Sequence, residues 1–289
     1  MDERDWTILL ALYETNSITK AAEMSFMSQP TLTSRLQQIE DRFGAQVVIR
    51  GRKGVIFTPE GKYLVECAQE MIRRIHIIEG RIRTIQNEVK GSLRIGASNF
   101  FTGNQLPELL CQFRNIYPNI EFYVTTNLSA KIVDLVTNYD VDVGFIRGDY
   151  KWVDKKDLLY VETMNIVYNQ KFEIDNLPLL PRIDYMNNNS VKYQLDTWWK
   201  DRFSQAPLIG MVVDRVNSCK EMVLRGLGYA FLPDGVLEES DNLFKLAMLG
   251  QNDQPLIRRT WMLYHEDNLQ IALIKAFVDF VNKVNVYAL

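Results

Sequence analysis

The 289-residue sequence contains only two histidines, His76 and His265, and three cysteines. A histidine-based metal site or catalytic dyad is difficult to assemble from two histidines so far apart in the chain. The cysteines at positions 67, 111 and 219 are odd in number and lack metal-ligand spacing, so they fit reduced thiols rather than a disulfide framework. We therefore expect a cytoplasmic protein with no metal, no cofactor and no catalytic residue.

Long apolar runs and a strong net charge are also missing. No run approaches the ~20 apolar residues that span a bilayer, and the N-terminal MDERDW is too charged for a secretory signal, so we expect no membrane partner. The net charge of −3 argues against indiscriminate nucleic-acid binding, although residues 28–58 hold five basic groups against two acidic ones. The length predicts two or three globular domains.

Residues 1–58 have the pattern of a helix-turn-helix followed by a hairpin. An apolar stripe over residues 6–13 predicts a first helix, and SITKAAEMSF predicts a short second helix whose alanines permit a close crossing. In the third, QPTLTSRLQQIEDRF, Leu32, Leu36 and Ile39 are spaced to face a core, with Ser28 as N-cap and Gly44 as C-cap. The opposite face carries small or hydrogen-bonding side chains that are mostly uncharged.

Two short strand-like stretches follow, QVVIR and VIFT, joined by GRKG. The glycines supply the turn and place Arg50, Arg52 and Lys53 at its tip. A helix-turn-helix with a basic hairpin is the winged form of the DNA-binding motif, in which one helix enters the major groove and the wing reaches phosphates or the minor groove. A small helical domain with an ordinary surface hairpin is the alternative, and the ordered combination favours DNA binding.

Residues 59–90 predict one long helix, which begins with Thr58 as N-cap and Pro59 at its first position. Its apolar residues alternate in spacing between four and three without a break: Leu64, Ala68, Met71, Ile75, Ile78, Ile82, Ile85 and Val89. This heptad seam predicts a coiled coil with a partner helix and hence a homodimer, the alternative being a long core helix of one domain. A dimer would present two recognition helices to half-sites about one DNA turn, or a multiple of it, apart.

Residues 91–289 predict an α/β effector domain. Strands and helices alternate as β-α-β-α-β, which is typical of a parallel sheet with ligand-facing loops at the strand C-termini. We expect lobe I at 91–160 plus 267–289, lobe II at 161–266, and a ligand cleft between them. The predicted fold class is therefore α/β, with a mostly α winged helix-turn-helix, a linker helix and two lobes of the periplasmic-binding-protein type.

This order of motifs resembles that of the LysR-type transcriptional regulators. The resemblance rests on SITKAAEMSFMSQPTLTSRLQQIEDRFG, VVIRGRKGVIFTPEG, KGSLRIGAS, VDVGFIRG and GLGYAFLP. It implies binding to double-stranded promoter DNA, a small-molecule effector, and homodimers that assemble further into homotetramers. VDRVNSCKEMVLRGLG, FIRGD and PLIRRTWM are similar to the citrate-responsive catabolite-control regulators of low-GC Gram-positive bacteria.

The resemblance implies DNA contacts from the start of the third helix and from the wing. The implied residues are Ser28, Gln29, Pro30, Thr31, Thr33, Ser34, Arg35, Arg50, Arg52 and Lys53. Helical periodicity independently turns Pro30, Thr33 and Ser34 away from the core. Many family members carry arginine where this chain has Ser34, whereas here arginine comes one residue later, about 100° round the helix. The base preference therefore need not match that of relatives.

The candidate effector residues are polar or cationic side chains near the ends of strands. They are Ser98, Asn99, Thr102, Asn127, Ser129, Arg147 and Arg258. Helix N-termini after the first two strands could bind an anion. Arg147 and Arg258, from opposite lobes, would suit a di- or tricarboxylate because each can bind bidentately, and the narrower resemblance points to the same two positions and to citrate. The alternative for either arginine is a salt bridge, and Arg259 is expected at the surface.

We therefore predict a ligand-responsive transcriptional regulator without enzyme activity. No acid–base or nucleophile constellation supports an enzyme. A stand-alone solute-binding protein would have the two lobes but would need neither residues 1–58 nor the heptad seam. A carboxylate that closes the lobes would change how dimers are arranged on DNA.

Overall fold

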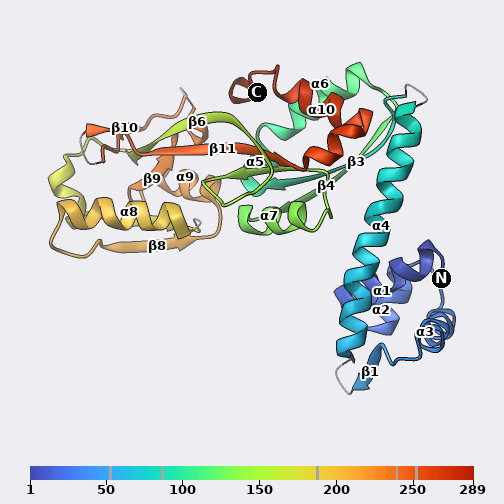
Figure 1. Cartoon of the computed structure of the whole chain (residues 1–289). Helices are drawn as coiled ribbons and strands as arrows, with labels where there is room; N and C mark the ends of the chain where they lie inside the picture. The colour runs from blue at the N-terminus through green and yellow to red at the C-terminus, as the bar shows by residue number, and fades with distance from the viewer. Residues whose placement is uncertain (52–53, 86–87, 187–188, 239, 251–252) are drawn as a thin grey trace. The chain divides into compact units, whose positions relative to one another are not determined.

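The computed structural model describes residues 1–51, 54–85, 88–186, 189–238, 240–250 and 253–289. The chain divides into two compact units, Met1–Asn87 and Glu88–Leu289, each of which is drawn in Figure 1. None of the described helices combines the length and the apolar composition that crossing a bilayer requires.

The first unit is a winged helix-turn-helix followed by a long helix. Its elements are α1 (Glu3–Thr15), α2 (Ile18–Met24), α3 (Gln29–Phe43), β1 (Val48–Gly51), β2 (Gly54–Phe57) and α4 (Pro59–Ile85). β1 and β2 pair antiparallel, as the wing requires. The predicted inward face of α3 is confirmed, because Leu32, Leu36 and Ile39 are all buried in one core with α1, α2, the hairpin and the start of α4. Gly44 caps α3 with φ of 62°, a left-handed conformation that favours glycine.

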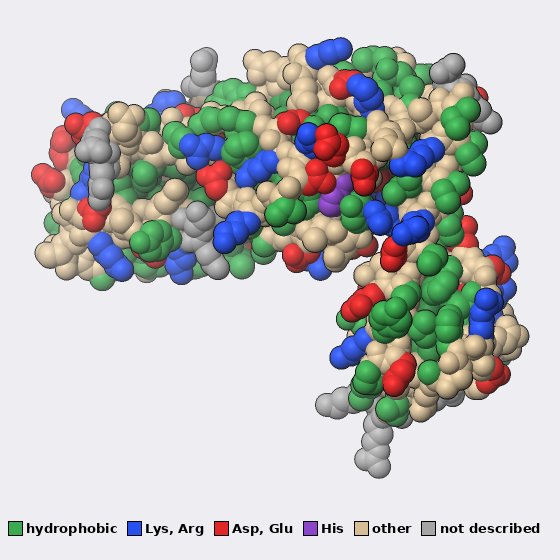
Figure 2. Space-filling view, in the orientation of Figure 1, with side chains coloured by type: hydrophobic (Ala, Val, Ile, Leu, Met, Phe, Trp, Pro, Cys, Tyr) green, Lys and Arg blue, Asp and Glu red, His purple; other side chains and the backbone are tan. Residues whose placement is uncertain are grey.

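The long helix α4 is shorter than predicted and uses its seam in two ways. It ends at Ile85, so Val89 lies outside the helix. Leu64 and Ala68 are buried in the core of the first unit. By contrast, Ile78, Ile82 and Ile85 are 57%, 52% and 81% exposed. Figure 2 shows hydrophobic side chains at the surface along this part of α4, among charged ones. Only the C-terminal part of the seam is therefore free to pack on a partner helix.

The second unit is built on a seven-stranded mixed sheet ordered β10-β6-β11-β5-β3-β4, with β9 also paired to β6. Its strands are β3 (Gly91–Ser98), β4 (Ile120–Asn127), β5 (Val143–Arg147), β6 (Lys155–Tyr168), β7 (Arg182–Tyr185), β8 (Ile209–Val213), β9 (Ala230–Pro233), β10 (Phe244–Ala247) and β11 (Ile257–Tyr264). Its helices are α5 (Asn99–Gly103), α6 (Leu106–Ile116), α7 (Ser129–Thr137), α8 (Asn189–Arg202), α9 (Val216–Leu224) and α10 (Ala272–Val281). β7 and β8 form a separate parallel pair.

Lobe I has the predicted parallel arrangement, since β3 pairs in parallel with both β4 and β5. Helices α6 and α10 cover one face of this sheet and α7 covers the other (Figure 1). β5 is buried along its whole length because both faces are covered. Phe145 stacks on Phe101 at 4.4 Å between ring centroids, while Ile146 packs in the cluster formed with α7. Gly144 gives α7 its close approach, because a Cβ there would clash with Val136.

The two lobes share continuous strands, so the sheet itself has no break between them. The expected boundary after residue 160 falls inside β6. β11 pairs antiparallel with both β5 and β6, so residues 260–264, expected in lobe II, belong to the sheet of lobe I. A register shift between Thr260 and Trp261 interrupts the ladder with β6. The residue pattern did not reveal the boundary because a strand that crosses from one lobe to the other has no turn or break at the crossing.

Candidate DNA-binding surface and effector cleft

The start of α3 is fixed by its own polar residues. The backbone N–H of Thr31 donates to Ser28 Oγ at 3.3 Å, and the two hydroxyl oxygens lie 2.7 Å apart. Pro30 occupies the first turn, where a missing N–H costs no intrahelical hydrogen bond. Thr19 Oγ1 donates to Gln29 Oε1 at 3.3 Å, which connects α2 to α3. Ser28 and Thr31 thus orient the helix that carries the predicted base-reading residues.

The outward face of α3 is polar and uncharged. The residues that line a shallow hollow on it are Gln29, Pro30, Thr33, Ser34, Gln37 and Gln38. The first four belong to the predicted DNA-binding set, and the two glutamines extend the same face by one turn. Gln37 Nε2 donates to Asp41 Oδ1 at 2.9 Å, which orients its amide. Amides and hydroxyls in this arrangement can both donate to and accept from base edges.

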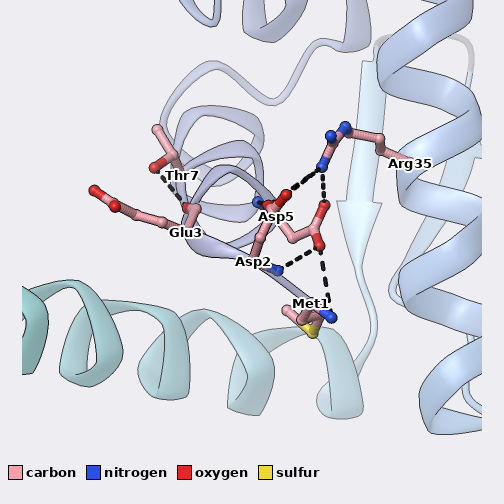
Figure 3. A network of polar contacts seen from close by, with 6 residues as sticks. All are labelled: Met1, Asp2, Glu3, Asp5, Thr7 and Arg35. Carbon is pink, nitrogen blue, oxygen red and sulfur yellow. Dashed lines mark hydrogen bonds and ion pairs between the residues drawn. The ribbon is translucent and has the colours of Figure 1, made fainter.

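Arg35 is engaged inside the first unit. Its Nη1 lies 2.7 Å from Asp5 Oδ1 and 3.3 Å from Asp2 Oδ1 (Figure 3). Asp2 also forms the N-terminal capping box of α1 with Asp5. Hydrogen bonds to Asp5 and then to Asp2 raise the pKa of Arg35. The side chain expected at the edge of the DNA-contact set therefore connects α3 to the start of α1, through partners about thirty residues upstream.

The wing is attached to the helices at its base. Glu40 Oε1 accepts a hydrogen bond from the backbone N–H of Val47 at 2.7 Å. The N–H of Val55 donates to the carbonyl oxygen of Asn16 at 3.0 Å, beside Gly54, where a Cβ would clash with that same oxygen. Of the predicted wing residues, Arg50 lies in β1 opposite Val55. Arg52, Lys53 and the side chain of Arg50 lie outside the described residues.

A cleft of about 690 Å³ lies between the two lobes of the second unit. Six of the seven predicted effector residues line it: Ser98, Asn99, Asn127, Ser129, Arg147 and Arg258. Thr102 does not, because its hydroxyl donates to the carbonyl oxygen of Ser98 and accepts from Thr126. Lobe II also contributes residues that the sequence did not suggest, among them Tyr185, Arg215 and Asn217.

Arg147 is buried at the inner end of the cleft and forms an ion pair with Glu162. Its guanidinium lies over the ring of Phe100, 3.7 Å from the centroid. Its backbone N–H donates to Ser129 Oγ at 3.0 Å, so this serine positions the start of α7 against β5. The salt-bridge alternative therefore applies to Arg147. Glu162 was missed by sequence reasoning, although a single acidic residue in the apolar stretch YVETMNIVY was the available signal.

Arg258 faces the same end of the cleft without a counter-ion. It lies opposite Glu162 in the β6–β11 register, yet it makes no ion pair with any described residue. Its Nε is buried and also has no hydrogen-bond acceptor among the described residues. Burial, followed by the positive charge of Arg147, lowers the pKa of Arg258. The negative charge of an anion bound here would offset both the cost of burying this cation and its repulsion from Arg147.

The Ser98 hydroxyl is another buried polar group of the cleft. It is 5% exposed and has no hydrogen-bond partner among the described residues. Buried polar groups are normally paired, so those left without a partner in a cleft mark where a ligand's polar atoms can bind. A buried N–H of a cation and a buried hydroxyl together fit a small anion that has several acceptor oxygens.

The remaining candidates for chemistry are clusters of metal-ligating side chains and the buried cysteine. Within the described ranges, no three His, Cys, Asp or Glu residues gather as a metal site. Cys219 is buried, its Sγ donates to the carbonyl oxygen of Ile183 at 3.6 Å, and burial raises the pKa of its thiol to about 12. Such a thiol is a packing residue rather than a nucleophile.

Two segments of the chain match known protein families. Residues 4–62 match the bacterial regulatory helix-turn-helix proteins of the lysR family, and residues 86–285 match the LysR substrate binding domain. The chain therefore belongs to the LysR family. It is a ligand-responsive, DNA-binding transcriptional regulator, and its homologues are regulators rather than enzymes.

Individual relatives agree with this assignment over nearly the full length. The HTH-type transcriptional regulator YraN of Bacillus subtilis (strain 168) is 40% identical over 281 residues, 97% of each chain. YkuM of the same organism is 29% identical over 283 residues, again 97% of each. Among solved structures, a full-length OxyR variant from Pseudomonas aeruginosa has a TM-score of 0.70 at 18% identity, covering 99% of this chain and 96% of that one. Full-length CbnR in complex with its target DNA has a TM-score of 0.64 at 17% identity, covering 98% and 99%. The predicted fold class is confirmed.

Proposed function

We propose that this regulator binds its promoter through the polar face of α3 and the wing, and that a small carboxylate in the interlobe cleft controls it. Gln29, Pro30, Thr33 and Ser34 contact base edges in the major groove. Ser28 and Thr31 hold the helix start in position. The wing contributes phosphate or minor-groove contacts, which position the protein without reading sequence, through Arg50, Arg52 and Lys53.

The uncharged character of the α3 face supports this division of roles. Its hydroxyls and amides suit base edges, and Arg35 is already paired with Asp2 and Asp5. The test is salt-dependent binding of the purified protein to the DNA upstream of its own gene. We expect nanomolar specific binding at moderate salt, with an affinity that falls as salt rises. Equal affinity for this DNA and for unrelated DNA would refute the proposal.

One observation carries the effector proposal: among the described residues, Arg258 lines the cleft without an ion pair, and the Ser98 hydroxyl of the same cleft has no hydrogen-bond partner. A ligand carboxylate could accept hydrogen bonds from both, with Arg147 close by. Asn99, Asn127 and Ser129 add polar groups on the side of lobe I. Citrate is the specific candidate, because the chain is similar to citrate-responsive regulators around Arg147 and Arg258.

A thermal-shift screen of small carboxylates tests this proposal directly. A ligand that binds only the folded state stabilises it by RT ln(1 + [L]/Kd), about 2.7 kcal/mol at a hundredfold excess over Kd. We expect Arg258→Ala to abolish the shift and the effector response while leaving DNA affinity intact. Arg147→Ala should do the same, but its unliganded melting temperature should also fall because Glu162 is left buried without its ion pair.

A matched control is Arg225→Ala. Arg225 is also in lobe II, but it is exposed and pairs with Glu221 on its own helix, outside the cleft. This variant should respond like the unmodified protein. If Arg258→Ala keeps the full ligand-induced shift, the site assignment is wrong.

We further propose that the protein forms homodimers through the exposed part of the α4 seam, and that dimers assemble into homotetramers on DNA. Carboxylate binding closes the lobes and changes the arrangement of the dimers. The ligand acts only through its different affinities for the two arrangements.

A further inference from the structure

Glu162 is a buried carboxylate that does not itself line the effector cleft but pairs with Arg147, which does. Its side chain is fully inaccessible, and its Oε2 pairs with Arg147 Nη2. Its Oε1 accepts a hydrogen bond from the backbone N–H of Gly235 at 3.0 Å. A Cβ on Gly235 would come within 2.9 Å of that oxygen, so the backbone of lobe II closely approaches the carboxylate. Glu162 is thus held from both lobes and cannot easily turn away from the ligand.

The charges around the cleft are nearly balanced without a ligand. Asp149 pairs with Arg259 at 2.9 Å, and Asp214 lies 3.8 Å from the neighbouring Arg215. Among the described residues at the inner end, the guanidiniums of Arg147 and Arg258 lie near one carboxylate, that of Glu162. Arg147 takes this carboxylate, and one excess positive charge is left on Arg258.

We propose that Glu162 limits the charge of the effector that this cleft accepts. The inference rests on the proposed function, since it assumes that a carboxylate binds beside Arg258. One ligand carboxylate neutralises the excess charge at the inner end. Every further carboxylate is repelled by the buried charge of Glu162 across a partly desolvated space, where like charges interact far more strongly than in water. Glu162 is therefore a specificity-determining residue: it weakens the binding of di- and tricarboxylates, citrate included, relative to what Arg147 and Arg258 alone would allow.

The first test compares acetate, succinate and citrate by titration calorimetry at constant ionic strength and neutral pH, on the unmodified protein and on Glu162→Gln. Glutamine retains an oxygen for the Gly235 N–H but removes the charge. We expect the substitution to tighten binding by about tenfold for each charge on the ligand, so that citrate gains most and acetate least. A gain that is equal for the three ligands, or no gain at all, would overturn the inference.

Asp157→Asn is the matched control, because it makes the same charge change on the same strand. Asp157 accepts hydrogen bonds from the Tyr264 hydroxyl at 2.8 Å and from Asn282 at 2.9 Å, and neither partner lines the cleft, whereas Arg147, the partner of Glu162, does. This control should leave the ranking of the three ligands unchanged. If it alters the ranking as Glu162→Gln does, the effect is one of overall charge and the inference is wrong.

A second test needs no variant and decides the matter if Glu162→Gln does not fold. Succinamate replaces one carboxylate of succinate by an amide of the same shape. The unmodified protein should bind succinamate at least as tightly as succinate, and a tenfold preference for succinate would overturn the inference. If no carboxylate binds to either protein, the proposed function fails and this inference fails with it. If carboxylates bind but without this charge dependence, only the inference fails.

Discussion

Replacing Ile78 with glutamate tests the proposed dimer at the centre of the exposed seam. Ile78, Ile82 and Ile85 are at least half exposed in the single chain, and all three lie on one stripe of α4. The buried residues earlier in the seam, Leu64 and Ala68, already pack in the core of their own unit. The variant therefore changes a residue that lies outside the core cluster of the first unit.

The size of the effect follows from these exposures. Fully burying an isoleucine side chain contributes about 1.5–3 kcal/mol. A residue that is half exposed in the monomer can therefore add about 1 kcal/mol or more when a partner helix covers it. A symmetric dimer loses this twice in Ile78→Glu and also brings two carboxylates together across the seam. We expect a total loss of about 4 kcal/mol, which is roughly a thousandfold in the dimer dissociation constant.

Sedimentation over a dilution series measures this constant. Tyr63→Glu is the control, because Tyr63 is 65% exposed on the same helix but lies off the seam, so it should leave the dimer intact. Operator binding by Ile78→Glu should weaken together with dimerisation, because one protomer then reaches only one half-site. If Ile78→Glu dissociates no more readily than Tyr63→Glu, the coiled-coil proposal is refuted.

Three further predictions concern other parts of the molecule. Arg35→Ala should leave the salt dependence of operator binding unchanged, whereas Arg50→Ala should reduce its slope by about one; a reduced slope for Arg35→Ala would show that Arg35 contacts phosphate. Burial opposes ionisation of Asp154, but the hydrogen bonds from His265 and from backbone N–H groups outweigh it and lower its pKa below the ordinary 3.8. The contribution of Asp154 to stability should therefore be present above about pH 3.8 and be lost as the pH falls through the lowered pKa. The melting temperature of Asp154→Asn should for this reason fall less steeply in acid than that of the unmodified protein. Cys219 should resist iodoacetamide at pH 8 in the folded protein, because a pKa of about 12 leaves only about one thiol in ten thousand ionised. Exposed Cys111 should be alkylated first. Mass spectrometry that finds both cysteines modified at the same rate would contradict this prediction.

The first unit could be predicted closely because its signals are local. Ser28, Gly44 and the spacing of Leu32 and Leu36 act within one or two helical turns, and all of them have the predicted role. The parallel strands of lobe I were also predictable, since strands and helices alternate along the chain. Such local agreement between pattern and structure is what sequence periodicity can report.

The interactions that the sequence did not reveal join residues far apart in the chain. Arg35 is paired with Asp2 and Asp5, 33 and 30 residues away. Glu162 binds Arg147 and the backbone of Gly235, 15 and 73 residues away. Neither pairing leaves a periodic trace, because a salt bridge requires only that the fold bring two charges together. The position of Arg147 in the cleft could be predicted from its place at a strand end. Its counter-ion, Glu162, could be identified only from the structure.

The attachment of the wing has a consequence for operator architecture. Glu40 and the carbonyl oxygen of Asn16 bind the backbone of the hairpin at Val47 and Val55 respectively. The distance from the recognition helix to the base of the wing is therefore built into the fold of one protomer. A half-site lengthened by one base pair between the two contacted segments cannot be matched by adjusting this unit. Extra base pairs between half-sites, by contrast, change only how two protomers must be placed, and this is the geometry that we propose the effector changes.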